Sequence, residues 1–176
     1  MRIISGKYRG KILHPGKDFI ARPTTDFAKE SLFNIMANQY DFEEIEVLDL
    51  FSGTGSISFE FASRGCKNIE AVESNYKYAT YIYKTGNELK FSQLKVHKTN
   101  AFQFLKSCNS KFDIIFADPP YDMEGTETLP EIIIGKKMLK QGGVFILEHS
   151  KKINFTENAH LIDHRNYGSV NFSFFQ

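Results

Sequence analysis

The segment Asp118-Pro119-Pro120-Tyr121 gives the most specific indication of a chemical function in this sequence. It follows the apolar run 114–117, which has the pattern of a buried strand. Proline lacks an N–H group and has a fixed φ angle, so the turn presents carbonyl oxygens that only accept hydrogen bonds. Asp118 adds an ionised acceptor and Tyr121 a flat aromatic face. These four residues suit a planar group with two N–H bonds, such as the exocyclic amino group of a base, and we expect them to be catalytic. The alternative is a rigid turn closed by a core tyrosine.

A glycine-rich turn follows an earlier strand, at residues 49–56. Gly53 and Gly55 lack a Cβ atom, so the backbone can turn tightly and a ligand can come close. Ser58 stands where a dinucleotide fingerprint has its third glycine, and no Gly-Lys-Ser/Thr is present to hold phosphates. Asp49 precedes the glycines, and a carboxylate there repels phosphates and attracts a cationic amino group. The pattern favours a cofactor loop over a purely structural turn.

Glu73 is the second acid of this kind, 24 residues after Asp49 and at the end of the next expected strand. A carboxylate in this place can accept hydrogen bonds from both hydroxyls of a ribose. By itself Glu73 could be an exposed acid at a strand end. Together with the glycine-rich turn, it indicates a nucleoside-containing cofactor.

The elements that must position these residues alternate along the chain. Apolar runs predict strands at residues 46–50, 69–73, 94–97, 113–117 and 144–148. Helical patterns separate them, a first helix follows Thr25, and residues 160–175 predict an antiparallel hairpin. Such alternation indicates an α/β fold with a mostly parallel sheet and helices on both faces. Ligands bind beyond the carboxyl ends of the strands in such sheets, and the three motifs all lie there.

The composition is that of one soluble domain of 176 residues, with 41% hydrophobic and 24% charged residues. The longest apolar runs have four residues, whereas a membrane helix needs about 20, so we expect no membrane span and no secretory signal. Cys66 and Cys108 are too few for a disulfide framework or a four-cysteine zinc site, and they suit a cytoplasmic protein. The five histidines show no metal-ligand spacing, so we expect no metal.

Positive charge is concentrated at the start of the chain. Residues 1–17 carry Arg2, Lys7, Arg9, Lys11 and Lys17 without an acid, whereas the rest has 17 basic and 21 acidic residues. The segment has the pattern of two short strands around a glycine-containing turn. A basic hairpin on a mildly acidic body favours contact with a polyanion, although a solvated hairpin without a partner would look the same.

The motifs, in this order, resemble the S-adenosylmethionine-dependent methyltransferases that act on exocyclic nitrogens. Within that class the chain is similar to the RsmD family, whose members methylate N2 of a guanine in 16S ribosomal RNA. The likeness covers residues 1–11, Arg22-Pro23-Thr24-Thr25-Asp26, residues 30–34, 49–55 and 118–121, and Tyr167-Gly168. It implies a Rossmann-like class I methyltransferase with a seven-stranded, mostly parallel sheet and a small N-terminal β-hairpin extension. The expected division is a hairpin of residues 1–20 that contacts RNA and a methyltransferase domain of residues 21–176.

The resemblance also implies roles for individual residues. The cofactor-binding residues would be Asp49, Phe51, Gly53, Gly55, Glu73, Asn100, Ala101, Arg22 and Thr24. The RNA-binding residues would be Arg2, Lys7, Arg9 and Lys11, and the substrate 16S rRNA or a small-subunit assembly intermediate. The family usually has Asp-Ala at Asn100-Ala101, and arginines at Phe27 and Lys29, so the contacts made there can differ.

Other functions remain open from the sequence alone. An adenine-N6 methyltransferase acting on DNA or RNA uses the same Asp-Pro-Pro-Tyr turn, although the N-terminal motifs argue against it. A protein-glutamine methyltransferase more often has Asn in place of Asp118. A binding module without activity would have little reason to keep the complete acceptor turn. A hydrolase lacks support because the chain has no Gly-x-Ser-x-Gly motif.

Overall fold

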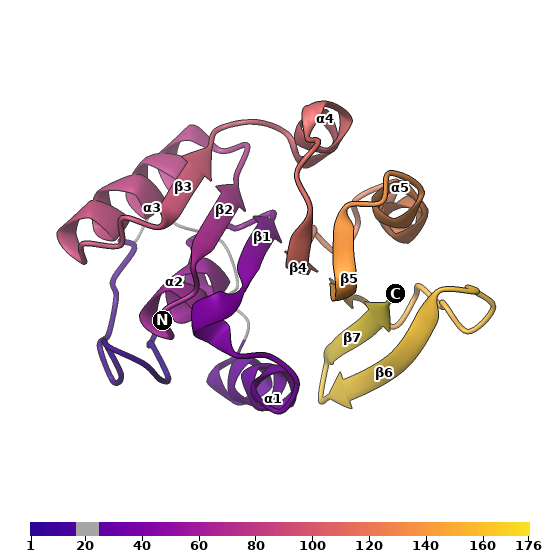
Figure 1. Cartoon of the computed structure of the whole chain (residues 1–176), viewed down its shortest axis with the longest axis horizontal. Helices are drawn as coiled ribbons and strands as arrows, with labels where there is room; N and C mark the ends of the chain where they lie inside the picture. The colour runs from indigo at the N-terminus through magenta and orange to yellow at the C-terminus, as the bar shows by residue number, and fades with distance from the viewer. Residues whose placement is uncertain (17–24) are drawn as a thin grey trace.

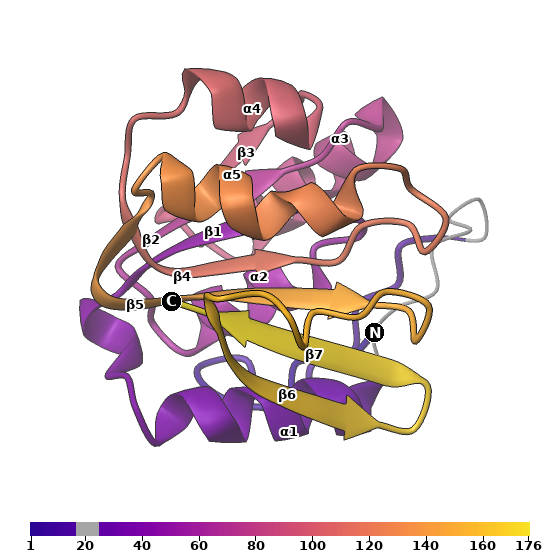
Figure 2. The same ribbon diagram turned by 90° about the vertical axis from the view of Figure 1, so that its right-hand side faces the viewer.

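A seven-stranded sheet is the centre of the computed structural model, which describes residues 1–16 and 25–176. Its strands are β1 (Glu46–Leu50), β2 (Asn68–Val72), β3 (Leu94–His97), β4 (Phe112–Ala117), β5 (Leu139–His149), β6 (Leu161–Tyr167) and β7 (Val170–Phe175). Their spatial order is β3-β2-β1-β4-β5-β7-β6 (Figures 1 and 2). β1 to β5 are parallel, and β7 runs antiparallel to β5 and β6. The expected mostly parallel sheet is confirmed.

Three of the five described helices begin at a residue whose side chain accepts free N–H groups of the first turn. They are α1 (Asp26–Ala37), α2 (Ser56–Ser63), α3 (Tyr76–Glu88), α4 (Ala101–Ser107) and α5 (Leu129–Gly135), with 3-10 turns at Phe42–Glu44 and Thr126–Thr128. Thr25 caps α1 by accepting from the Ala28 amide at 3.2 Å. Asn75 and Asn100 cap α3 and α4 in the same way. None of the described helices is long and apolar enough to cross a bilayer.

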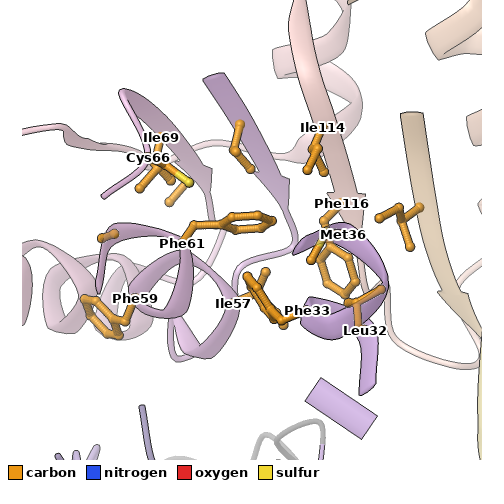
Figure 3. Packing of buried hydrophobic residues seen from close by; sticks show 14 of the residues in the cluster. Leu32, Phe33, Met36, Ile57, Phe59, Phe61, Cys66, Ile69, Ile114 and Phe116 are labelled. Carbon is orange, nitrogen blue, oxygen red and sulfur yellow. The ribbon is translucent and has the colours of Figure 1, made fainter. Parts of the chain in front are cut away.

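Two layers of helices cover the sheet. Figure 1 shows α1, α2 and α3 on one face and α4 and α5 on the other. Successive strand residues point to opposite faces, so Val47 and Ile114 belong to one buried cluster and Leu48 and Ile115 to the other. Figure 3 shows part of the first cluster, in which residues from α1 and α2 pack beside β4. Burial on both faces explains why the central strands are almost continuously apolar.

β5 extends further than the apolar pattern predicts. The expected strand 144–148 is its buried part, but pairing with β4 begins at Leu139, opposite Phe112. The register shifts between Phe112 and Ile114, and Gly143 lies at this irregularity. A Cβ at Gly143 would lie 2.9 Å from the Phe112 carbonyl oxygen, so the chains come too close for a side chain. Glycine in a sequence normally weakens a strand prediction, which is why this part was not predicted.

The N-terminal hairpin is held by the body of the protein more than by its own strands. Its strand pairing is a single bridge, Arg2 to Ile12. Ile4 and Ser5 donate their amides to the Glu60 carboxylate of α2 at 2.7 and 3.0 Å. Ile3 and Leu13 of the hairpin are buried in the cluster beneath α1 and α2. Residues 1–16 therefore share the core of the rest of the chain, and the division at residue 20 stays a prediction.

Candidate active site

A cleft of about 430 Å³ opens at the carboxyl ends of β1, β2, β4 and β5. The sequence-predicted residues that line it are Asp49, Phe51, Gly53, Glu73, Asn100, Ala101, Asp118, Pro119, Pro120 and Tyr121. Arg22 and Thr24 lie outside the described residues. The basic residues of the hairpin, Arg2, Lys7, Arg9 and Lys11, do not line the cleft. The structure thus brings the three sequence motifs together.

The glycine-rich turn uses left-handed backbone conformations. Phe51 and Gly53 have φ angles of 60° and 54°. The Gly53 amide donates to one oxygen of the Glu73 carboxylate at 2.8 Å, which fixes the turn against the end of β2. A Cβ at Gly53 would have only the Phe51 carbonyl oxygen within 4.0 Å. Gly53 therefore leaves open space on the cleft side, where a ligand can approach the backbone.

Gly55 has a different place from the one the sequence suggests. It precedes α2 at φ 79° and does not line the cleft. A Cβ there would lie 2.9 Å from the Phe59 ring and 3.0 Å from Ile82 of α3. The absent side chain makes room for packing between α2 and α3, in addition to allowing the turn.

Asp49 is almost completely buried at the floor of the cleft. The Ser58 hydroxyl of α2 donates to its carboxylate. Burial raises the pKa of Asp49 to about 7, and this hydrogen bond only partly opposes the increase. Sequence analysis treated Ser58 as a missing glycine, whereas the structure makes it the partner of Asp49. The rotation of α2 decides this contact, which spacing alone does not predict.

Glu73 is buried beside the glycine-rich turn, just beyond the end of β2. Its second carboxylate oxygen accepts the Asn75 amide at 2.7 Å, where α3 begins. Each carboxylate oxygen has two lone pairs, so both can accept a further hydrogen bond from a ligand in the cleft. Glu73 can bind vicinal hydroxyls while it holds two loops in place.

Asn100 lines the cleft at the start of α4, and its side-chain oxygen is already in use. That oxygen accepts the amides of Phe102 at 2.9 Å and Gln103 at 3.4 Å. The amide nitrogen is therefore the Asn100 atom best placed to contact a ligand. An aspartate cap would offer an acceptor in this position, so the change to Asn replaces an acceptor by a donor.

The Asp118 corner faces the same cleft from the end of β4. The Pro120 carbonyl accepts the Met123 amide at 2.9 Å and closes the turn. Tyr121 is 45% exposed, so its ring is accessible at the rim. Burial, together with the nearby Glu148 and Asp49 carboxylates, raises the pKa of Asp118 well above its usual range. The corner can accept hydrogen bonds and, when ionised, a proton.

Glu148 is a buried cleft residue that sequence analysis did not select. It lies near the end of β5 and follows the same strand-end rule as Asp49, Glu73 and Asp118. The strand expected at residues 144–148 ends at Glu148, so the signal was present in the sequence. Four acids, Asp49, Glu73, Asp118 and Glu148, therefore lie along one edge of the sheet.

The two departures from the family pattern on α1 have different environments. Lys29 is buried, and its Nζ donates to the Arg2 carbonyl at 2.6 Å and the Ser56 hydroxyl at 3.1 Å. Burial lowers the pKa of Lys29, although Glu60 nearby favours its charge. Phe27 is 69% exposed, and its ring lies 6.0 Å from that of Tyr167. Lys29 thus ties the hairpin to α2 and is not exposed for RNA contact.

In the part of the chain that is described, no group of three or more His, Cys, Asp and Glu side chains is arranged to hold a metal ion. The acids that line the cleft lie at the ends of neighbouring strands. Their carboxylates accept hydrogen bonds, so they suit a ligand with amino and hydroxyl groups.

Comparison with known proteins identifies the family. The family model described as Conserved hypothetical protein 95 matches residues 1–176. Ribosomal RNA small subunit methyltransferase D of Haemophilus influenzae is 31% identical over 182 residues, which cover 100% of this chain and 93% of that protein. The protein of the same name from Buchnera aphidicola is 30% identical over 88% of this chain and 78% of its own. The solved structure of yhhF from Escherichia coli superposes with a TM-score of 0.87 at 25% identity, over 100% of this chain and 97% of that one. The chain therefore belongs to the Conserved hypothetical protein 95 family, the RsmD family of methyltransferases that its sequence resembles.

Proposed function

We propose that this protein transfers a methyl group from S-adenosylmethionine to the exocyclic N2 of a guanine in 16S ribosomal RNA, either free or in a small-subunit assembly intermediate. Family membership supports methylation of ribosomal RNA. The observation that carries the proposal is the shared cleft, where Asp49 and Glu73 face the same space as the Asp118 corner. A cofactor loop and an amine-binding turn must adjoin in this way for direct transfer.

The cleft fits S-adenosylmethionine on chemical grounds. Glu73 has free lone pairs for the ribose hydroxyls, and Asp49 offers a buried acid for the cationic amino group. Gly53 leaves space for close approach, while Ala101 and the Asn100 amide lie where they can meet the adenine. The cofactor supplies a methyl group on a positively charged sulfur, which leaves as a neutral thioether.

The residues of the Asp118 corner would hold the acceptor nitrogen. The lone pair of a guanine amino group is delocalised into the ring, so orientation matters more than raw basicity. Hydrogen bonds from N2 to the Asp118 carboxylate and the Pro119 carbonyl fix its direction. Positioning of this kind contributes roughly 7 to 11 kcal/mol in well-oriented systems. Tyr121, at the rim, would stack on the base after it leaves the RNA stack.

Asp118 would also interact with the positive charge that develops on N2 as the new bond forms. An ionised carboxylate stabilises this positive charge and then accepts the proton that N2 loses. A raised pKa makes Asp118 a better proton acceptor than an ordinary aspartate. Methyl transfer would therefore decline at acidic pH, where Asp118 becomes protonated.

The basic hairpin would bind the RNA backbone outside the cleft, as the charge of residues 1–17 suggests. Ribosomal RNA as substrate also implies that the protein works in the cytoplasm. Adenine-N6 methylation remains the second candidate, because the Asp118 corner can hold an adenine amino group in the same manner. The N-terminal motifs and the named relatives favour guanine in ribosomal RNA.

The test is methyl transfer with tritiated S-adenosylmethionine to unmethylated 16S rRNA, to small subunits and to DNA. We expect label in N2-methylguanosine from the RNA or the subunits. Label in DNA alone would establish the adenine alternative, and cofactor binding without transfer would indicate a binding module.

Asp118→Ala is the first variant for this assay. We expect methyl transfer to be abolished while S-adenosylmethionine binding, measured by calorimetry, stays near the wild-type value. The reason is that Asp118 contacts the acceptor nitrogen rather than the cofactor in this arrangement. Near-normal turnover by Asp118→Ala would refute the role given to this carboxylate.

A further inference from the structure

The register of β4 and β5 places two carboxylates side by side. Ala117 at the end of β4 is paired with Leu147 of β5, so the next residues along the parallel strands are Asp118 and Glu148. Neighbouring strands are about 4.8 Å apart. Both residues line the cleft, and Glu148 is only 3% exposed. The Glu148 charge raises the pKa of Asp118, as expected of close neighbours.

Glu148 lies on the side of the cleft away from the residues proposed to bind the cofactor. The residues proposed for the cofactor come from β1, β2 and the start of α4. β5 lies beyond β4 in the strand order, on the side away from β1 and β2. A base held by Asp118 would therefore present its adjoining edge to Glu148.

Two adjacent carboxylates favour a ligand that has two adjacent hydrogen-bond donors. Buried like charges repel each other, and a ligand that supplies hydrogen-bond donors to both offsets part of that cost. Guanine carries N1–H and an N2 amino group next to each other on one edge. Adenine offers an amino group beside a bare ring nitrogen, whose lone pair would face the second carboxylate.

We propose that Glu148 is a specificity-determining residue that accepts the N1–H of the target guanine while Asp118 accepts its N2 amino group. This inference rests on the proposed function and extends it to the choice of base. Glu148 discriminates by repulsion as well as attraction, because its carboxylate opposes the lone pair of an N1 atom that has no proton. The residue thus accounts for preference for guanine over adenine at a turn that suits both.

The experiment compares two bases at the methylated position of the substrate RNA, which the transfer assay identifies. One substrate has guanine, and the other has 2-aminopurine, which keeps the 2-amino group but has no proton on N1. We expect the wild-type protein to prefer guanine in kcat/KM by about 10- to 100-fold, the size of a hydrogen bond to a charged group. In Glu148→Gln we expect this preference to fall at least tenfold, because the amide can accept from guanine or donate to 2-aminopurine.

The change in preference between the two proteins is the decisive quantity, since the intrinsic reactivities of the two bases cancel. Asp118→Asn is the matched control and should slow both substrates by similar factors. Glu148→Asp is the second variant, which keeps the charge and therefore a preference for guanine. An unchanged preference in Glu148→Gln, or no preference in the wild type, overturns the inference while leaving the proposed function intact. Absence of any transfer to RNA by the wild type overturns the proposed function, and this inference with it.

Discussion

Asp49 shows how burial of a single acid ties stability to pH. Its carboxyl lies at the cleft floor, and its pKa is raised to about 7 from 3.8, first by burial. An acid with a raised folded-state pKa binds more protons when folded than when unfolded. The contribution of Asp49 to the stability of the fold is fully present below the pKa of the unfolded chain, near 4. It is lost as the pH increases to about 7.

Asp49→Asn should weaken this pH dependence. We expect the wild-type free energy of unfolding to decrease between about pH 5 and pH 8, and to decrease less in Asp49→Asn, which has no carboxyl to ionise. The difference between the two proteins is on the order of 2 kcal/mol. Urea unfolding at both pH values measures it. Equal slopes would mean that Asp49 ionises as easily in the folded chain as in water.

The acids of the site could be predicted because they follow a topological rule. Glu73 and Asp118 each follow the last residue of a strand, Asp49 is the second-last residue of β1, and parallel strands end at the same edge. Glu148 obeys the rule and could have been predicted too. The Ser58 contact with Asp49 depends on how α2 is rotated against β1, which tertiary packing determines and local sequence does not.

At the scale of elements, the hairpin is docked on α2 through two close backbone approaches. A Cβ at Gly6 would lie 1.9 Å from the Ser63 carbonyl oxygen, while the amide of Lys7 donates to that oxygen at 2.7 Å. Gly10 has a similar positive φ angle, 83° against 78°, but nothing lies within 4 Å of its Cβ position. A substitution at Gly10 therefore tests backbone strain alone, whereas one at Gly6 tests strain together with a steric clash.

Gly6→Ala should displace the hairpin, whereas Gly10→Ala should only add strain. We expect Gly10→Ala to cost about 1 kcal/mol, as a non-glycine residue does in the left-handed region. Gly6→Ala should cost clearly more and should weaken RNA binding as well. Thermal unfolding and RNA binding of both variants provide the measurement. Equal losses in the two variants would show that the close approach to Ser63 does not hold the hairpin.

The positive charge of the hairpin should make RNA binding depend on the salt concentration. Replacing Lys7, Arg9 and Lys11 by Gln should weaken RNA binding and flatten its dependence on salt. The expected change is about 0.7 to 0.9 of logarithmic slope for each phosphate that the protein no longer neutralises. Titrations at several salt concentrations measure this slope, with S-adenosylmethionine binding as a control that should not change. If the slope is unaffected, the RNA path lies elsewhere on the surface.

At the scale of the whole molecule, the fold class follows from the alternation of strands and helices, whereas the hairpin attachment does not. Lys29 and Glu60 have the residue types of a solvated surface, yet the structure buries both beneath the hairpin. Their Nζ and Oε2 atoms are 3.9 Å apart. The contact joins segments 31 residues apart in sequence, so no local pattern reports it.

Removal of residues 1–16 should therefore destabilise the entire domain. It would leave the Glu60 carboxylate without the Ile4 and Ser5 amides and uncover the core beneath Ile3. Glu60 would keep Lys29 and Arg64 as partners, and each lost hydrogen bond to its charge costs about 1.5 to 3 kcal/mol. We expect a large fall in the melting temperature, measured by calorimetry. A truncated protein that melts like the full chain would show that the hairpin is an independent appendage.

Under the proposed function, the anchoring of the hairpin would also limit which nucleotides can react. Lys29 joins the Arg2 carbonyl to Ser56, and Ser56 borders the cleft, so direct contacts connect residues 1–16 to the edge of the cleft. The distance between the RNA phosphates bound by the hairpin and the reacting base would then be fixed by the fold. Guanines nearer to or farther from these phosphates along the same strand would not reach the cleft. The attachment of the hairpin would thus select one guanine among many, which recognition of the base alone could not do.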